Sequence, residues 1–572
     1  MRRVIRRLPA LWRATRLARR WYHARFGAYP DWQPIVSADA RMWQNARTAA
    51  AGGRRVLLAS SIGGYAHAVT LESALGAALT FRGADVHVLL CDAALPACAE
   101  CEASFYPNLT QFVAAGPAPD LCRDCRWPAE RVYRTLGFTV HKYSDWITPD
   151  DAAAARETAR TLPAAEIQAF TLDGVAIGEH AYAGALRFFA SGSLGSEPMG
   201  DAVLRRYLEG ALRTAYVSRR LMRSVGFEAA VFTHGIYVPW GIVGEVARSE
   251  QVRVVAWNVA YRKRRFIFSH DDTYHHTLMT EPRDHWEQRQ LSPAEDAALG
   301  RYLASRRDGL FDWIVFHRPQ RTDAAETARR LRLDPARPVI GLLTNVTWDA
   351  QLHYPANAFP NMVEWLVRTC EYFATRPDLQ LLIRVHPAEI SGFPQSRQPV
   401  LAELRKRLPQ LPPNIVVVPP DSDMSTYTLM SLCNAAIIYG TKTGVELTSV
   451  GVPVIVAGEA WIRNKGLTYD ASTPAEYFEI LGRLPFADRL TGSHLARARR
   501  YAYHFFFNRM IPLPFVEPRA GFPIYRLRLR GLEELRPGAS RGLDTICNGI
   551  LERRPFVLDE QKAGALARAT GS

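Results

Sequence analysis

Short apolar segments, each ending in a turn marked by glycine or proline, constrain the fold of this chain most strongly. Residues 379–385, 435–439 and 452–456 are such segments, and stretches of helical length separate the first two. Apolar, β-branched runs joined by helix-length connections are typical of buried parallel strands. The sequence therefore predicts an α/β protein, and ligands of such sheets bind beyond the carboxyl ends of the strands.

Two of these strand ends carry side chains suited to a phosphorylated nucleotide. His386 ends the first strand, and Pro387 after it stops the strand so that the imidazole stays at the tip. The loop 440–446 follows the second strand, and its glycines and helix-opening N–H groups would form an anion cradle. Glu446 could accept ribose hydroxyls. The alternative is a strand-end histidine and an ordinary helix cap, and neither motif matches a P-loop.

The same residues resemble a known family. Val-His-Pro-Ala-Glu at 385–389 and Thr-x-Thr-Gly-x-Glu-x-x-x-x-Gly-x-Pro at 441–453 are similar to motifs of bacterial capsule polysaccharide biosynthesis proteins. That family contains GT-B-type glycosyltransferases, including capsule Kdo transferases. Sialyltransferases and glycerophosphotransferases of related architecture share the His-Pro element, and several use cytidine nucleotides. The resemblance covers about residues 338–470, and it implies donor contacts at His386, Thr443 and Glu446.

A GT-B-like fold consists of two Rossmann-like domains facing each other across a cleft. With 572 residues, the chain is long enough for two such domains and extensions. We expect a basic amphipathic arm at 1–30, a Rossmann-like acceptor domain at 31–330, a nucleotide-sugar domain at 331–500 and helices at 501–572 that pack back across the domains.

The donor site is predicted to draw on several loops of the second domain. Polar residues after the strand near 338–343, and a basic residue after the donor segment, could contact the sugar and the leaving phosphate. The predicted donor-binding residues are Arg384, His386, Glu389, Thr441, Lys442, Thr443, Gly444, Glu446, Asn345, Asp349 and Lys465.

A glycosyltransferase needs a carboxylate or imidazole to take the proton of the acceptor hydroxyl. His234 follows the predicted strand at 229–233, and a polar cluster follows at 269–275. The candidate catalytic residues are Asp271, Asp272, His270 and His234. The alternative for the cluster is a turn with solvated side chains.

Four cysteines are spaced as in a two-knuckle zinc site. Cys98-x-x-Cys101 and Cys122-x-x-Cys125 lie twenty residues apart, within an insertion at about 91–130. The pattern predicts structural zinc and no catalytic cofactor, with chance spacing, a redox pair or an iron–sulfur cluster as alternatives.

Positive charge is concentrated at the N-terminus. The chain carries a formal net charge of +15, and residues 1–26 hold nine arginines, interleaved with Trp12 and Tyr22, with no acidic residue before Asp31. This pattern predicts docking on an anionic membrane surface, the alternative being a solvated basic arm. With no apolar run of about 18 residues and no convincing signal peptide, we expect a cytoplasmic protein, peripheral on the inner membrane.

Together these features predict a glycosyltransferase that builds capsule or related surface polysaccharide. The donor would be a nucleotide-activated sugar, with CMP-linked sugars among the candidates, and its binding would need no metal. The acceptor would be a glycan or lipid-linked glycan. The alternatives are a glycerophosphotransferase-type polymerase and a nucleic-acid-binding zinc protein. We expect no nucleic acid partner, because membrane docking explains the basic excess equally well.

Overall fold

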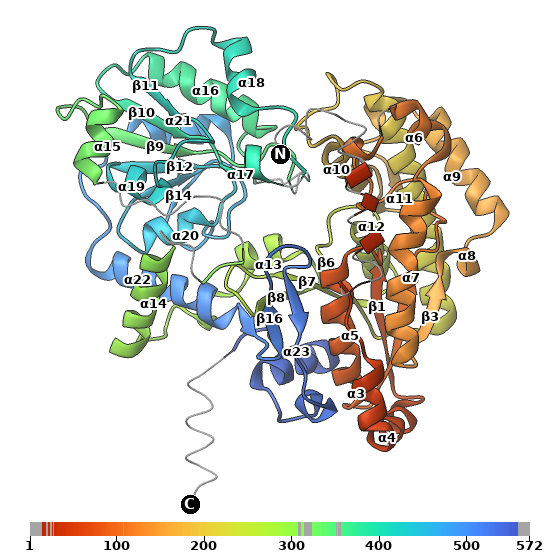
Figure 1. The fold of residues 1–572 in the computed structure, drawn as a ribbon. Coiled ribbons are helices and arrows are strands. Elements are labelled where there is room, and N and C mark those ends of the chain that lie inside the picture. Colours follow the sequence, from red (N-terminus) through yellow and green to blue (C-terminus); the bar gives the residue numbers. More distant parts are fainter. Residues whose placement is uncertain are drawn as a thin grey trace, which may run out of the picture. The chain divides into compact units, whose positions relative to one another are not determined.

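The computed structural model describes most of the chain, which forms two compact units (Figure 1). Unit 1 comprises Met1–Phe189, Ser193–Tyr274 and Arg509–Ser572, and unit 2 comprises Ala190–Gly192 and His275–Asn508. The described residues are 14–15, 17–18, 21–22, 26, 28–106, 108–306, 311–313, 323–349, 352, 356–392 and 394–558. Most of the predicted basic arm therefore lies outside the described residues.

Unit 2 is built on a parallel sheet of six strands in the order β11-β10-β9-β12-β13-β14. If the strands are numbered along the chain, their order across the sheet is 3-2-1-4-5-6, as in a Rossmann sheet. The switch point, at which the strand order reverses, lies between β9 and β12. The strands are β9 (Val339–Leu343), β10 (Gln380–Arg384), β11 (Ile415–Val418), β12 (Ala435–Ile438), β13 (Val454–Val456) and β14 (Tyr469–Asp470).

Both faces of this sheet are covered. On one face, Ile340, Leu342 and Ile437 pack in a core with residues of α16, α18 and α21. On the other, the Cα of Gly341 leaves room for Met430 of α19, which a Cβ there would approach to 2.7 Å. The helices of this part of the chain are α14 (Pro293–Ser305), α15 (Ala324–Arg330), α16 (Met362–Ala374), α17 (Ala388–Ser391), α18 (Val400–Arg407), α19 (Thr426–Ser431), α20 (Thr443–Thr448), α21 (Pro474–Gly482) and α22 (Gly492–Tyr503).

Unit 1 contains a mixed sheet of seven strands in the order β15-β8-β7-β6-β1-β2-β3. The five strands from β7 to β3 run parallel. Counted from β3 to β7 and numbered along the chain, their order is 3-2-1-4-5, and the switch point lies between β1 and β6. β8 is antiparallel to β7, and β15 is antiparallel to β8. The strands are β1 (Arg54–Ser61), β2 (Ala84–Leu90), β3 (Thr139–Lys142), β6 (Ala229–Thr233), β7 (Arg253–Val259), β8 (Arg265–His270) and β15 (Ile511–Pro512).

Helices and two small hairpins complete unit 1. Residues after Asn508 return to this unit, where β15 extends the sheet. The remaining elements are α3 (Gln33–Ala38), α4 (Ala40–Ala50), α5 (Ala66–Thr80), α6 (Leu109–Ala115), α7 (Pro119–Thr135), α8 (Tyr143–Trp146), α9 (Pro149–Thr161), α10 (Gly178–Phe189), α11 (Gly200–Val225), α12 (Trp240–Ser249), α13 (Tyr274–Thr280, which leads into unit 2), α23 (Arg541–Glu552), and the hairpin strands β4 (Thr171–Leu172), β5 (Val175–Ala176), β16 (Val516–Pro518) and β17 (Tyr525–Leu527).

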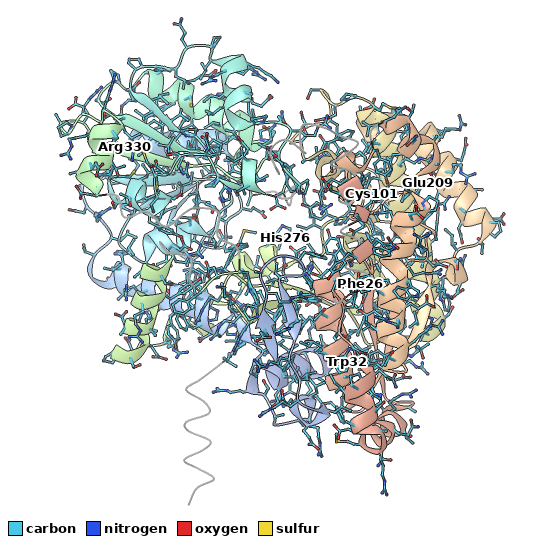
Figure 2. The ribbon with its side chains drawn as sticks, in the orientation of Figure 1. Phe26, Trp32, Cys101, Glu209, His276 and Arg330 are labelled. Atoms are coloured by element: carbon cyan, nitrogen blue, oxygen red, sulfur yellow. The ribbon has the colours of Figure 1, made fainter. Side chains whose placement is uncertain are left out.

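Buried polar side chains in unit 1 have partners that fix the packing of its helices (Figure 2). Trp32 is fully buried, and its indole Nε1 donates to Ser73 Oγ of α5 at 3.1 Å. Glu209 of α11 is 4% exposed, and its carboxylate pairs with Arg213 at 2.6 Å and with Arg206 at 3.4 Å. Charges on one helix face are thus neutralised within that helix.

The predicted α/β class is confirmed, with a parallel sheet in unit 2 and a mainly parallel, mixed sheet in unit 1. None of the helices within the described ranges has both the length and the apolar character needed to span a bilayer. The membrane contact of the N-terminal arm stays a prediction.

One buried acid in unit 1 makes its stability sensitive to pH. Glu72 of α5 is fully buried and accepts hydrogen bonds from Ser60 Oγ and from Trp257 Nε1, the latter at 3.0 Å. Burial raises the pKa of Glu72 to about 7, although these hydrogen bonds oppose the shift. The folded protein therefore holds a proton on Glu72 at pH values where the unfolded chain has released it.

We predict that Glu72→Gln removes this pH dependence. Because the folded pKa is raised, the contribution of Glu72 is fully present below pH ~4.5 and is lost as pH rises through 7. Between pH 5 and 8, wild-type unfolding free energy should fall by about 2 kcal/mol relative to the Gln variant. Chemical denaturation across this range measures the difference. Glu479→Gln, at an exposed position, is the control, and its free energy of unfolding should vary with pH as that of wild type does. The same pH dependence in wild type and Glu72→Gln would contradict the prediction.

Candidate functional site

The carboxyl edge of the unit 2 sheet brings the predicted strand-end loops together at its switch point. Asn345 follows β9, and its Nδ2 donates to the carbonyl of Gly440, which follows β12. A Cβ on Gly440 would lie 3.0 Å from the carbonyl oxygen of Glu459, so glycine is required by close backbone packing. The two loops are therefore held against each other where Rossmann-type sheets bind ligands.

His386, at the end of β10, is oriented by two backbone hydrogen bonds. Its N–H donates to Thr344 Oγ1 at 3.0 Å, and its Nδ1 accepts the N–H of Ala388 at 3.1 Å. Burial, together with the nearby charges of Lys442 and Arg384, lowers the pKa of His386 to about 4. The imidazole is thus neutral near pH 7. Since Nδ1 accepts, the proton is on Nε2, which can donate to an oxygen of a ligand.

Arg384, two residues earlier, is a buried cation with little compensation. Its side chain is 2% exposed, and Nη1 donates to the carbonyl of Pro419. Its Nε and Nη2 are buried, and neither has a hydrogen-bond partner among the described residues. Burial lowers the pKa of Arg384 to about 10, with partial opposition from Asp421. Such a guanidinium is costly to bury and would be stabilised by a bound anion.

Other buried polar atoms without partners lie in loops on the same edge. They are Oδ1 of Asn345, Oγ1 of Thr347 and Oγ of Ser425, which follow β9 and β11. Nearly all buried polar groups in folded proteins are hydrogen-bonded. A concentration of unpaired donors and acceptors around Arg384 indicates a site for a polar, anionic ligand.

Lys442 and Glu446 are engaged in a network inside unit 2. Glu446 is 3% exposed, and its oxygens accept from Lys442 Nζ at 2.6 Å and Tyr427 OH at 2.8 Å, with Arg306 Nε at 3.0 Å. Burial would raise the pKa of Glu446, but Arg306 and Lys442 lower it to about 2. Burial and Arg306 lower the pKa of Lys442 to about 8. Any ribose contact of Glu446 would compete with these donors.

The loop between β12 and α20 is stabilised mainly by its own contacts. Thr441 Oγ1 lies 3.2 Å from Thr443 Oγ1 and accepts the N–H of Thr443 at 3.3 Å. A Cβ on Gly444 would clash with Ile438 and Ile462, so this glycine permits core packing. The helix α20 has only six residues, so its dipole adds little to anion binding.

Three further predicted donor residues lie in different surroundings. The Glu389 carboxylate is buried and accepts the N–H of Val400 at 2.8 Å, which caps α18. Lys465 is fully buried, and its Nζ donates to the carbonyl of Met279 at 3.1 Å. Asp349 is exposed after β9. The interior position of Lys465 does not suit a contact with the leaving phosphate, so we do not include it in the site.

The switch point of unit 1 also carries polar side chains. His234 follows β6 and has a positive φ of 68°, a conformation that non-glycine residues rarely adopt. His67 lies in the first turn of α5 after β1, and burial lowers its pKa to about 4, while Glu100 opposes and His234 adds to this shift. His234 and Glu100 therefore each lie within electrostatic reach of His67.

The other three predicted catalytic residues are separated from His234. His270 is the last residue of β8, and Asp271 and Asp272 follow it. β8 runs antiparallel to β7, and the N–H of Asp271 donates to the carbonyl of Val254 near the start of β7. His270 Nε2 contacts the carbonyl oxygen of Arg554 at 2.8 Å, and Asp271 pairs with Arg553 at 2.8 Å. The Asp272 carboxylate accepts the N–H of Thr273. His270 and Asp271 thus lie at the amino edge of the parallel strands, opposite His234.

Sequence reasoning missed several residues at these edges. Arg306 and Tyr427 reach Glu446 from distant helices, and no local pattern signals such tertiary pairing. Glu459, whose carboxylate lies 3.1 Å from His276 Nε2, follows β13, and its place after a predicted strand was an available signal. Glu100 was overlooked because the cysteines on either side of it dominated the interpretation of that loop.

A family model matches the part of unit 2 that contains this sheet. Residues 314–484 match the family model described as "Capsule polysaccharide biosynthesis protein". Over this segment the chain matches the capsule polysaccharide biosynthesis family. The matched residues include both motifs and all of β9 to β14, so the resemblance predicted from the sequence is confirmed.

Solved structures show only remote similarity. The β-Kdo 2,4-transferase KpsC of Thermosulfurimonas dismutans is 15% identical, covering 48% of this chain and 80% of that one at a TM-score of 0.31. The β-Kdo 2,7-transferase KpsC of the same organism is 14% identical, with 55% and 86% coverage at 0.26. UDP-GlcNAc 2-epimerase from Neisseria meningitidis is 9% identical, with 78% and 98% coverage at 0.25. None of the curated proteins matches the chain.

We predict that Arg384→Met leaves the ligand-free protein as stable as wild type, or stabilises it by about 1 kcal/mol, because an uncompensated buried cation is removed. Stabilisation by added nucleotide should be lost. Thermal denaturation with and without nucleotide measures both effects.

Arg463→Met is the matched control for this prediction. Arg463 is also buried in unit 2, but its guanidinium donates to Gly458 O, Ala471 O and Ser472 Oγ at 2.6–3.2 Å. Its loss should destabilise the ligand-free protein by about 3 kcal/mol. Equal destabilisation by the two substitutions would show that Arg384 has a structural role only.

Proposed function

We propose that this protein is a glycosyltransferase that uses a nucleotide-activated sugar in the synthesis of capsule or related surface polysaccharide. The observation that carries the proposal is the buried, undercompensated guanidinium of Arg384, within electrostatic reach of the His386 imidazole, at the carboxyl edge of a Rossmann sheet. The match of residues 314–484 to the capsule polysaccharide family supports the reaction class.

Unit 2 would bind the donor. The Nη2 and Nε groups of Arg384 and the Nε2–H of His386 donate to phosphate oxygens of the nucleotide, and Asn345 Oδ1 accepts from a sugar or ribose hydroxyl. When the bond between the anomeric carbon and the phosphate oxygen breaks, negative charge grows on that phosphate. Fixed donors in a buried site stabilise this charge without reorganisation, and thus favour the transition state.

Unit 1 would supply the group that activates the acceptor. The acceptor, a glycan or lipid-linked glycan, attacks the anomeric carbon through a hydroxyl oxygen, and its proton must pass to a base. Of the four candidates named from the sequence, His234 is at the carboxyl edge, where its positive φ indicates a constrained position. We assign the role of base to His234.

A panel of nucleotide sugars tests the proposed activity. Purified full-length protein is incubated with CMP-, UDP- and GDP-linked sugars and a capsular oligosaccharide acceptor, and released nucleotide is measured. The proposal predicts acceptor-stimulated release from one nucleotide class, with CMP-linked sugars tested first. Release from none of them, together with no nucleotide-dependent thermal stabilisation, would overturn the proposal.

We predict that His386→Ala lowers kcat by about 100-fold, because one hydrogen bond to the developing phosphate charge is lost. With a pKa near 4, His386 is neutral in the working range, so its contribution should stay constant from pH 6 to 8. Steady-state kinetics of both proteins across this range measures the ratio. His494→Ala, which removes an exposed histidine of α22, is the control and should match wild type.

If the ratio of wild-type kcat to His386→Ala kcat falls as pH rises from 6 to 8, His386 acts as a cation, which contradicts the prediction. Unchanged kcat in His386→Ala would remove His386 from the donor site.

A further inference from the structure

The four regularly spaced cysteines of unit 1 gather beside the carboxyl ends of β1 and β2. Cys98 and Cys101 lie in a turn after β2, where the N–H of Cys101 donates to the carbonyl of Cys98 at 2.9 Å. Cys122 and Cys125 lie one turn apart near the start of α7, so they project from similar sides of that helix. The turn after β2 and the first part of α7 thus each present two thiols.

The sulfur positions suit tetrahedral coordination in the first pair. Cys98 Sγ and Cys101 Sγ are 4.0 Å apart. Two thiolates bound to zinc at about 2.3 Å in tetrahedral geometry would be about 3.8 Å apart. A disulfide instead requires a separation of about 2.05 Å. The pair therefore has nearly the spacing that one shared zinc ion would impose.

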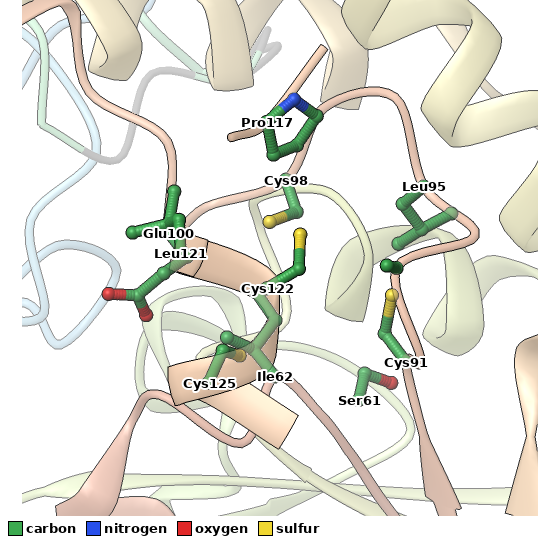
Figure 3. Close-up of a pocket in the computed structure, with 11 residues that line it drawn as sticks. Ser61, Ile62, Cys91, Leu95, Cys98, Glu100, Pro117, Leu121, Cys122 and Cys125 are labelled. Carbon is green, nitrogen blue, oxygen red and sulfur yellow. The ribbon is translucent and has the colours of Figure 1, made fainter. Parts of the chain in front are cut away.

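A small cavity connects this pair with the second one (Figure 3). Its volume is about 20 Å³, and Cys98, Cys122 and Cys125 line it together with Cys91. In Figure 3 the sulfurs of Cys98 and Cys122 point toward each other across this space. A volume of this size accommodates about one water-sized particle, which is also the scale of a single metal ion.

Two contacts around the cysteines would support a four-thiolate centre with zinc bound. The N–H of Gly64 donates to Cys125 Sγ at 3.0 Å, an outer-shell contact of the kind that orients metal ligands. The half-buried Arg187 donates to the carbonyl of Ala99, between Cys98 and Cys101, at 2.5 Å. Its positive charge would offset part of the charge of a four-thiolate centre.

We propose that Cys98, Cys101, Cys122 and Cys125 form a structural zinc site. Among the described residues, no three potential ligands already converge as tightly as in a closed site, so zinc would draw the sulfurs inward by side-chain rotation. Four thiolates leave no open coordination position, which makes the site structural and not catalytic. Zinc would fasten the turn at 98–101 to α7.

This site would also fix the position of Glu100. The residue lies between two ligands, and its carboxylate is within electrostatic reach of His67. In Figure 3 the Glu100 side chain points away from the sulfurs. Zinc would therefore act on the polar edge of unit 1 only through the backbone, by holding the loop that carries Glu100.

Metal analysis of the full-length protein, purified without a metal-chelating tag, tests the proposal. We expect about one zinc ion per chain, with only sulfur neighbours at about 2.3 Å in X-ray absorption. Cys98→Ser and Cys122→Ser should each lose the zinc. The controls are Cys370→Ser and Cys547→Ser, which alter buried thiols in unit 2 and unit 1 and should keep it.

If the ligand variants fail to fold, titration of the wild-type protein with an organomercurial replaces them, and a colorimetric chelator should detect zinc release in proportion to the thiols modified. Three outcomes would overturn the proposal. They are wild-type protein without zinc after anaerobic reconstitution, iron with visible absorption in its place, and zinc retained by both ligand variants. Failure of glycosyl transfer would not affect this result, because the readout is metal content.

Discussion

The burial of Arg384 without an anionic partner is the constraint on which the account of unit 2 depends. The Arg384 guanidinium is 2% exposed and has one carbonyl acceptor and two nitrogens without a partner among the described residues, so its burial lowers the free energy of unfolding. Apolar packing in the core of the surrounding sheet must offset this destabilisation. Proteins commonly retain such costs at binding sites, where the ligand provides the missing interactions. The neutral imidazole of His386, held by Thr344 and Ala388, completes a rigid pair of donors.

The two units use the same topological device for different chemistry. Each has a set of parallel strands whose order reverses once, between β9 and β12 in unit 2 and between β1 and β6 in unit 1. At the switch point of unit 2 the polar groups include hydrogen-bond donors and a cation, which suit an anionic ligand. At the switch point of unit 1 they are His67, His234 and Glu100, which suit proton transfer. The division of labour in our proposal follows from these residue types.

Local sequence patterns were sufficient for the strands, their carboxyl ends and the residues placed there. The runs ending at Val385 and Tyr439 form β10 and β12, and His386 and Asn345 lie at the sheet edge as expected. Long-range pairings were beyond that reasoning, as the Arg306–Glu446 contact shows. The antiparallel direction of β8, in contrast, had a local signal. Only five residues separate β7 from β8, too few for a parallel crossover, and this signal could have warned against grouping His270 and Asp271 with His234.

A crystal structure of the protein with a bound nucleotide sugar would show directly whether Arg384 and His386 hold the donor. We expect a phosphate of that ligand within hydrogen-bonding distance of Arg384 Nη2 and His386 Nε2, at the carboxyl ends of β9, β10 and β12. A nucleotide bound elsewhere, with Arg384 still contacting only the carbonyl of Pro419, would contradict it.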